Sequence, residues 1–160
     1  MQPGMTTLYR PVGLYELALI AATGFRTYPP RLPEQPIFYP VLDRTYADEI
    51  ASQWNPPDPN SGFAGFVTRF VVPASVARRY PAQTVGARRH RELWVPAEEQ
   101  SAFQAAFQGP IEVLAAWVGP RIREALPAWL GAQGPVSVDE LPALVRAVHH
   151  GPRQGGPLTA

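Results

Sequence analysis

The hydrophobic and polar positions of the chain follow two different periods, which predicts a mixture of strands and helices. Similar side chains recur at every second position from Phe63 to Val72 and from Ile111 to Trp117, which is typical of β-strands. Thr7 to Val12 is predicted as a shorter strand. Apolar positions three and four residues apart predict one helix from Leu14 to Ala21 and another from Tyr46 to Trp54.

Shorter elements are predicted from the residues at their ends. Ile37 to Tyr39 is a short β-prone run, and Glu92 to Val95 is expected to form a strand that stops at a proline. Thr45 is the expected N-cap of the second helix, with Asp48 at the third helical position, an arrangement close to a capping box. A further helix is predicted over residues 96–107, because proline is favoured in a first turn.

The predicted order is strand, helix, strand, helix, long strand, strand, helix, strand and then helices, which defines an α+β fold with mostly non-local strand pairing. The 20 prolines lie mostly between these segments, so the connections are expected to be stiff and ordered. With 160 residues the chain is long enough for one domain with a core. We expect that domain over residues 1–119, a helical extension packed on it over residues 120–150, and a frayed tail over residues 151–160.

Composition and charge exclude several classes of function. A formal net charge of +1 gives no global field that would attract nucleic acid or an anionic membrane. The absence of cysteine excludes a disulfide framework, a thiolate nucleophile and a cysteine-based zinc site. Met1 to Thr7 lacks the layout of a signal peptide, and the apolar run from Leu14 to Ala22 contains Glu16 and is too short to span a bilayer. We therefore expect a soluble, cytoplasmic protein without a membrane partner.

Three stretches place charged or aromatic side chains on predicted strands: Leu8-Tyr9-Arg10, Ile37-Phe38-Tyr39 and His90-Arg91-Glu92-Leu93-Trp94-Val95-Pro96. A helix that ends near Gly24-Phe25 follows the first stretch, and a helix with an alanine-rich inner face follows the second. In this order the three stretches resemble the ADP-ribosyltransferase superfamily, in particular its small bacterial members. The resemblance extends over roughly residues 7 to 118 and rests on the order and spacing of the motifs.

The resemblance implies a fold of split mixed or antiparallel β-sheets flanked by short helices. It also implies an enzyme that uses NAD as a substrate, cleaves the nicotinamide–ribose bond and transfers ADP-ribose, without a metal. The acceptor stays open between a protein, a nucleic acid, a small molecule and water. A role as a toxin or effector follows from the resemblance only by analogy.

The resemblance makes Glu92, Arg10 and Tyr39 the catalytic residues. Contacts with NAD are expected from Arg10, Tyr9, Phe38, Tyr39 and His90. Because side chains alternate along a strand, only one of Phe38 and Tyr39 can face the cleft.

Each proposed role has a physical reason. Cleavage of the nicotinamide–ribose bond builds positive charge on the ribose, and the fixed carboxylate of Glu92 would stabilise that charge. The planar guanidinium of Arg10 matches the phosphate oxygens of NAD, and the ring of Tyr39 could stack on nicotinamide. His90 lies two residues before Glu92 and so on the same strand face. A histidine there differs from the glutamine or glutamate of the arginine-modifying branch, which leaves the acceptor open.

Each candidate also has a purely structural interpretation. Arg10 can extend from a strand edge or pair with Glu16, Tyr39 can pack in the core, and Glu92 can be a solvated charge. For the whole chain, the alternative is a catalytically inactive binding module of the same fold. Such a module would hold a partner protein through a groove or through the helices after residue 120.

Two further groups of residues also have a functional and a structural interpretation. The cluster of Arg88, Arg89 and Arg91 is either an anion-binding patch for the phosphates of NAD or a solvated loop. His149 and His150 are adjacent and lack a neighbouring carboxylate or cysteine, so they are expected at a helix C-terminus and not in a metal site.

Overall fold

The structure, a computed structural model, describes residues 4–84 and 90–121. The expected frayed tail, nearly all of the expected helical extension, Arg88, Arg89, His149 and His150 lie outside the described residues. Within the described ranges no helix is long and apolar enough to cross a membrane.

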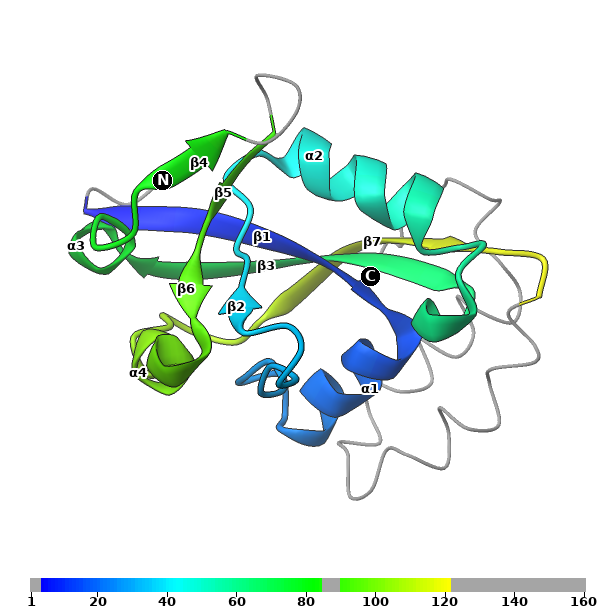
Figure 1. Cartoon of the computed structure of the whole chain (residues 1–160), viewed down its shortest axis with the longest axis horizontal. Coiled ribbons are helices and arrows are strands. Elements are labelled where there is room, and N and C mark those ends of the chain that lie inside the picture. The colour runs from blue at the N-terminus through cyan, green and yellow to red at the C-terminus, as the bar shows by residue number, and fades with distance from the viewer. Residues whose placement is uncertain (1–3, 85–89, 122–160) are drawn as a thin grey trace.

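Strands and short helices alternate along most of the described chain, and β4, β5 and β6 follow one another without a helix between them (Figure 1). The strands are β1 (Met5–Gly13), β2 (Ile37–Phe38), β3 (Ala64–Pro73), β4 (Ala82–Thr84), β5 (Arg91–Leu93), β6 (Val95–Pro96) and β7 (Glu112–Val118). The α-helices are α1 (Leu14–Ala22), α2 (Arg44–Glu49), α3 (Ala74–Ala77) and α4 (Gln100–Ala105). A π-helical segment, η1 (Ile50–Trp54), continues α2, and two 3-10 turns are η2 (Pro59–Ser61) and η3 (Ala97–Glu99). The α+β class predicted from the sequence is confirmed.

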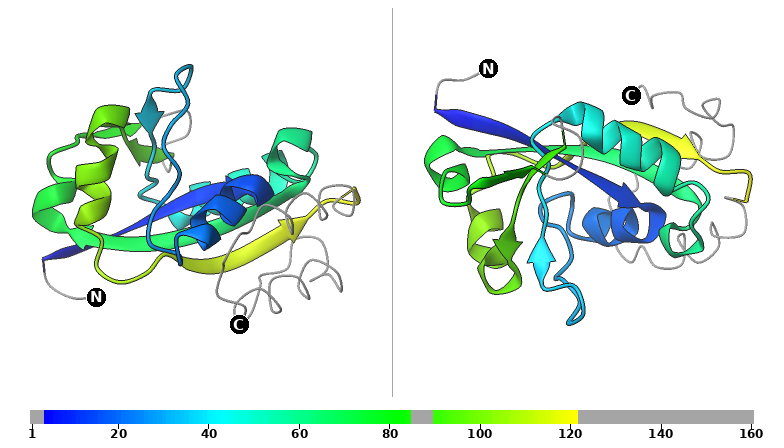
Figure 2. Two further views of the ribbon diagram at one scale, coloured as in Figure 1. Left: turned by 90° about the horizontal axis from the view of Figure 1, so that it is seen from below. Right: turned by 45° about the horizontal axis from the view of Figure 1, so that its top comes forward.

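The strands form three antiparallel groups, in the orders β1-β3-β7, β2-β6 and β4-β5. β1 and β3 pair along their whole length, with Leu8 opposite Phe70 and Val12 opposite Phe66. The β3–β7 pairing shifts register between Val67 and Thr68. Figure 2 shows that β2 rises out of the plane of the three-stranded sheet.

Side chains from both faces of the three-stranded sheet are buried. On one face the larger core joins the sheet to α1, α4 and the β2–β6 pair, and its fully buried aromatic side chains include Tyr28, Phe38, Phe66, Phe70 and Phe103. On the other face Val67 and Ala115 pack against the small side chains of α2 and η1. As the alternation along β3 predicts, Phe66, Thr68, Phe70 and Val72 are buried on one face while Val67 faces the other cluster.

A close backbone contact fixes α2 and η1 on the sheet. A Cβ atom placed on Gly65 of β3 would lie 2.0 Å from the carbonyl oxygen of Ala51 in η1. Only glycine therefore permits this approach, and Ala47 and Ala51, both fully buried, present the smallest side chains to the sheet. This contact determines where the side chains of α2 lie relative to β1.

Two local predictions are wrong. Thr45 is not the N-cap of α2, because the helix begins at Arg44 and the N-cap position falls on Asp43. The carboxylate of Asp43 makes no cap hydrogen bond and instead accepts two hydrogen bonds of 3.2 Å from Arg91. The predicted strand from Glu92 to Val95 is interrupted at Trp94, since β5 pairs with β4 while β6 pairs with β2.

Candidate functional site

Val41 joins two distant parts of the chain. Its backbone exchanges hydrogen bonds of 2.9 and 2.7 Å with Tyr9 of β1, and it lies opposite Glu92 of β5 on its other side. Two further backbone hydrogen bonds, of 3.0 and 2.8 Å, connect residues 40–42 with β5. Tyr9, Val41 and Glu92 therefore lie in one row across three adjacent segments.

The pairing between β1 and the segment around Val41 is limited to the single pair Tyr9 and Val41, and Pro11 explains why. In an antiparallel ladder the next hydrogen-bonded pair after Tyr9 and Val41 would join residue 11 to Tyr39. Pro11 has no N–H to donate, so the ladder is not extended and the two segments are not held together there. Arg10, on the opposite face of β1 from Tyr9, reaches this opening.

A cavity of about 350 Å³ lies at this opening. Three of the residues that the resemblance singled out, from three separate stretches of the chain, belong to its wall. The lining residues are Arg10, Pro11, Tyr39, Val41, Tyr46, Ile50, Glu92 and Trp94. The cavity wall is thus mainly aromatic and aliphatic, with one cation and one carboxylate.

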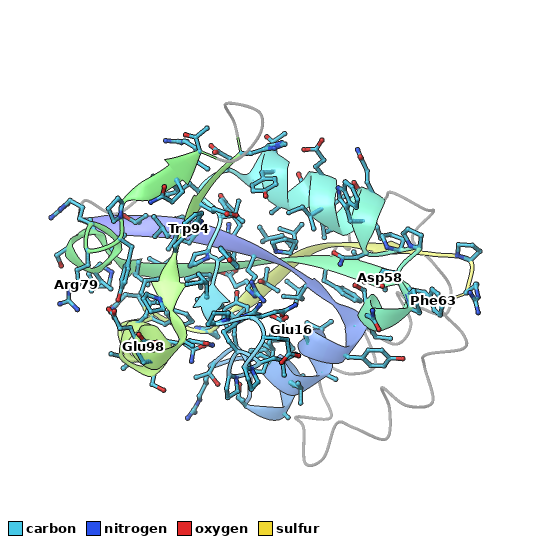
Figure 3. All side chains as sticks on the ribbon, viewed as in Figure 1. Glu16, Asp58, Phe63, Arg79, Trp94 and Glu98 are labelled. Carbon is cyan, nitrogen blue, oxygen red and sulfur yellow. The ribbon has the colours of Figure 1, made fainter. Side chains whose placement is uncertain are left out.

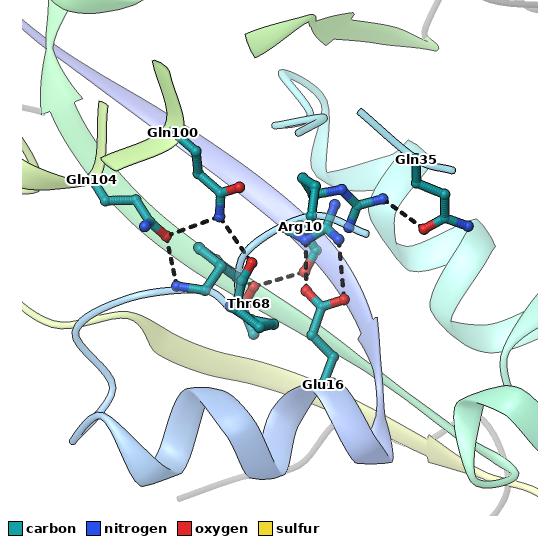
Figure 4. Close-up of polar contacts among 9 residues, drawn as sticks. Arg10, Glu16, Gln35, Thr68, Gln100 and Gln104 are labelled. Atoms are coloured by element: carbon teal, nitrogen blue, oxygen red, sulfur yellow. Dashed lines mark hydrogen bonds and ion pairs between the residues drawn. The ribbon is translucent and has the colours of Figure 1, made fainter. Parts of the chain in front are cut away.

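Arg10 is buried to 8% exposure and is held by Glu16 of α1. Its Nε and Nη2 atoms donate to the two carboxylate oxygens at 2.7 and 3.0 Å (Figure 4). The guanidinium also lies over the ring of Phe38, at 5.0 Å from the ring centre. Burial alone would lower the pKa of Arg10, but the charge and hydrogen bonds of Glu16 outweigh it and raise the pKa. Nη1 has no hydrogen-bond partner among the described residues.

A buried chain of hydrogen bonds fixes the backbone at Arg10. Thr68 Oγ1 donates to the carbonyl oxygen of Arg10 at 2.7 Å, and the hydroxyl of Tyr28 lies 2.7 Å from the same Oγ1. Figure 4 shows Gln104 and Gln100 of α4 beside this chain. Gln104 accepts from the backbone N–H of Tyr28 at 2.7 Å, so α4 supports the segment that lies beneath Arg10.

Glu92 is held by the side chain two residues further along. The indole Nε1 of Trp94 donates to Oε1 of Glu92 at 3.0 Å. Trp94 is 46% exposed, lies between β5 and β6 (Figure 3), and meets the ring of Tyr39 edge to face at 6.3 Å. Oε2 of Glu92 has no hydrogen-bond partner in the described part of the chain. One carboxylate oxygen is therefore positioned and the other is available.

Beside the cavity, His90 forms a pair with Glu49 at the end of α2. His90 Nε2 lies 2.7 Å from Glu49 Oε2, and the imidazole stacks on Tyr46 with ring centres 4.2 Å apart and planes at 15°. Tyr46 itself lines the cavity. Burial, followed by the negative charges of Glu92 and Glu49, raises the pKa of Tyr46. The phenol and both carboxylates therefore share one electrostatic environment.

The remaining candidates lie apart from the cavity wall. Phe38 is fully buried in the core beneath Arg10, so Tyr39, and not Phe38, faces the cavity. The side chain of Tyr9 packs against the smaller apolar cluster on the α2 face of the sheet. Among residues 4–84 and 90–121 there is no group of three or more His, Asp or Glu side chains that could hold a metal ion.

Four residues near the cavity were missed from the sequence: Arg31, Tyr46, Glu49 and Trp94. Tyr46 and Glu49 are three residues apart on one helix, so their side chains are expected on the same helix face. Trp94 is two residues from Glu92, so these two side chains are expected on the same side of a strand. For Arg31 the sequence gives no signal. Burial, followed by the charge of Arg10, lowers the pKa of Arg31, whose buried Nε has no hydrogen-bond partner in the described structure.

Comparisons of this chain with models of known protein families, with curated proteins and with solved structures gave no match.

Proposed function

We propose that this chain is an ADP-ribosyltransferase-like enzyme that cleaves the nicotinamide–ribose bond of NAD and transfers ADP-ribose to an acceptor or to water. The observation that supports the proposal is the shared cavity of Arg10, Tyr39 and Glu92. These residues belong to the three separate motifs that carry the resemblance. A chance resemblance gives no reason for the three side chains to meet.

The proposed reaction depends on the free oxygen of Glu92. Departure of nicotinamide leaves positive charge on the ribose, and a carboxylate held in place stabilises this charge without having to reorganise. The indole N–H of Trp94 supplies the fixed geometry on Oε1. Oε2 then faces the ribose, where it stabilises the cation and accepts a hydrogen bond from the neighbouring hydroxyl.

The other walls of the cavity suit the remaining parts of NAD. The nicotinamide ring of NAD carries a positive charge, and the rings of Tyr39, Tyr46 and Trp94 offer it aromatic surface beside a carboxylate. Nη1 of Arg10 provides a charged donor for a phosphate oxygen. Phe38 and Glu16 hold that guanidinium in one orientation.

The fold of the ADP-ribosyltransferase superfamily is part of the same proposal. Two features support it: the sheets are split and antiparallel, and the segment that carries Glu92 lies beside the segment that follows Tyr39. The short helices α1, α2 and α4 flank these sheets, as the resemblance implies.

The test is nicotinamide release from NAD by the purified protein. We expect the wild type to release nicotinamide and Glu92→Gln to lower kcat by at least about 100-fold, because removal of a charge-stabilising group costs that much. Glu98→Gln is the matched control, since Glu98 lies in η3 (Figure 3) and outside the cavity wall. Equal turnover in the wild type and in Glu92→Gln would remove Glu92 from its role.

One observation favours the second candidate function, a catalytically inactive module that binds a partner protein. The two hydrogen bonds from Arg10 to Glu16 engage two of the five N–H donors of the guanidinium and neutralise its charge, as in a structural ion pair. Isothermal titration calorimetry with NAD separates the two functions. Binding that is lost in Arg10→Met supports the enzyme, and the absence of any NAD binding by the wild type supports the module.

A further inference from the structure

We propose that His90, positioned by Glu49, is the general base that activates a hydroxyl acceptor, either water or an alcohol, for attack on the ribose of NAD. This inference rests on the proposed function and specifies the chemical class of the acceptor. Two observations support the inference: the contact between His90 and Glu49, and the position of this pair beside the cavity.

The His90–Glu49 pair has the geometry of an oriented acid–base unit. An ionised carboxylate only accepts hydrogen bonds, so the contact of 2.7 Å places a proton on His90 Nε2 and leaves the lone pair of neutral imidazole on Nδ1. Both side chains are mostly buried, at 18% and 27% exposure. Nδ1 has no hydrogen-bond partner among the described residues. The stacked ring of Tyr46 prevents the imidazole from rotating freely.

The pair adjoins the wall of the proposed site through Tyr46. Tyr46 covers one face of the imidazole and also lines the cavity, and Glu92 follows His90 by two residues on the same segment. The π-helical segment that begins at Ile50 directly follows Glu49, and Ile50 is itself a lining residue. π-helical turns of this kind often occur at functional sites.

The charged and titratable groups around His90 already have other partners or roles. The imidazole is therefore the group assigned as the base on this side of the cavity. From α2 they are Glu49 and the phenol of Tyr46, and from β5 they are Glu92 and Arg91. Arg91 is paired with Asp43 at 3.2 Å. Glu92 is assigned to the ribose cation and is held by Trp94.

The chemical step balances without any further reactant. Nδ1 of His90 takes the proton of the acceptor hydroxyl as its oxygen forms a bond to C1′ of the ribose. The C1′–N bond to nicotinamide breaks, and its electron pair stays on the ring nitrogen, which becomes neutral. The protonated imidazole then releases its proton to solvent, so NAD and an alcohol give an ADP-ribosyl O-glycoside, nicotinamide and one proton, while water gives ADP-ribose.

A hydroxyl fits this arrangement better than a guanidinium does. An arginine side chain keeps its positive charge far above neutral pH, so it would be bound by a carboxylate counter-charge on the acceptor side, which a neutral imidazole does not supply. A water or alcohol hydroxyl is neutral, and a neutral imidazole can accept its proton as the bond forms. The carboxylate of Glu49 is already engaged with the imidazole.

The test measures nicotinamide release from NAD by the whole chain with three acceptors: water alone, methanol and agmatine. We expect wild-type release with water, formation of methyl-ADP-ribose with methanol, and no stimulation by agmatine. His90→Ala should lower release by about 100-fold, the usual contribution of a general base. Free imidazole should restore part of that loss, and wild-type release should rise with pH to a plateau that His90→Ala lacks.

Two further comparisons of variants distinguish the positioning of His90 by Glu49 from a simple loss of structure. Glu49→Ala should lower release more than Glu49→Gln, because an amide oxygen can still accept from Nε2, while Asp48→Asn in the same helix should have no effect. His90→Phe keeps the stack on Tyr46 and should be as inactive as His90→Ala. Recovery with imidazole also shows that the variant is folded.

Several outcomes would overturn the inference. Wild-type rates in His90→Phe, absence of rescue by imidazole, or release that needs agmatine would each do so. In all three cases loss of release in Glu92→Gln would leave the proposed function standing. Wild-type protein that binds no NAD and releases no nicotinamide with any acceptor would remove the proposed function itself.

Discussion

At the residue scale, Arg10 is both a wall of the cavity and a cation of the core. The sequence allowed two interpretations, an NAD anchor or a partner of Glu16, and the ion pair of the second is present without removing Arg10 from the cavity. A guanidinium has five N–H donors, so it can hold a carboxylate with one edge and still offer a donor on another. The two interpretations are therefore compatible.

The stability of the fold should depend on this ion pair. Glu16→Gln leaves a buried cation without its counter-charge, and we expect a loss of about 3 kcal/mol in the free energy of unfolding. The control is Glu112→Gln, which breaks the exposed pair with Arg69 and should cost less than about 1 kcal/mol. Urea denaturation of both variants measures the difference. Equal losses would show that Arg10 is solvated well enough to need no partner.

At the element scale, the sequence predicted the helices and strands that depend on a local pattern of residues. It failed where a contact with a distant residue determines where an element begins. β1, α1, β3 and β7 follow from long periodic runs, and their positions agree with the structure. The start of α2 does not, because the carboxylate of Asp43 accepts from Arg91, far along the chain, and does not cap its own helix. The gathering of Arg10, Tyr39 and Glu92 was suggested only by resemblance, since no local signal reveals the pairing of Val41.

The contact between η1 and β3 gives a prediction about a single glycine. Gly65→Ala places a methyl group against the backbone carbonyl of Ala51, which cannot move aside as a side chain could. We expect a loss of about 3 kcal/mol in the free energy of unfolding. Gly24→Ala is the control, since Gly24 has φ of +72° with open space around it and should lose only about 1 kcal/mol. Thermal or urea unfolding distinguishes a backbone clash from backbone strain.

At the scale of the whole molecule, tyrosines link the stability of the fold to alkaline pH. Burial raises the pKa of Tyr28 and of Tyr46, and burial followed by the hydrogen bond to Glu99 raises the pKa of Tyr80 to about 12. These phenols stay protonated in the folded protein when those of the unfolded chain, with a pKa of about 10, already ionise. The unfolded state therefore loses protons first as the pH rises.

The contribution of these tyrosines to the free energy of unfolding should thus be constant below about pH 9 and fall as the pH rises through about 10 to 12. Tyr28→Phe should weaken this fall, because the most deeply buried of the three phenols is removed, while its lost hydrogen bond lowers stability by about 1 kcal/mol at every pH. Tyr15→Phe, which removes an exposed phenol on the outer side of α1, is the control for the loss of a hydroxyl group. Urea unfolding at a series of pH values tests this, and an identical fall in Tyr28→Phe would contradict it.

The position of Val41 between β1 and β5 determines how much of the chain must be synthesised before the cavity can form. Because Val41 is bonded to β1 on one side and lies opposite Glu92 of β5 on the other, the cavity lacks the wall formed by Glu92 and Trp94 until the chain has been made as far as Trp94. No fragment that ends before β5 can carry the site. A chain that is still on the ribosome therefore lacks this cavity until that point, and a ligand that binds in the cavity reports that the chain from β1 to Trp94 has folded.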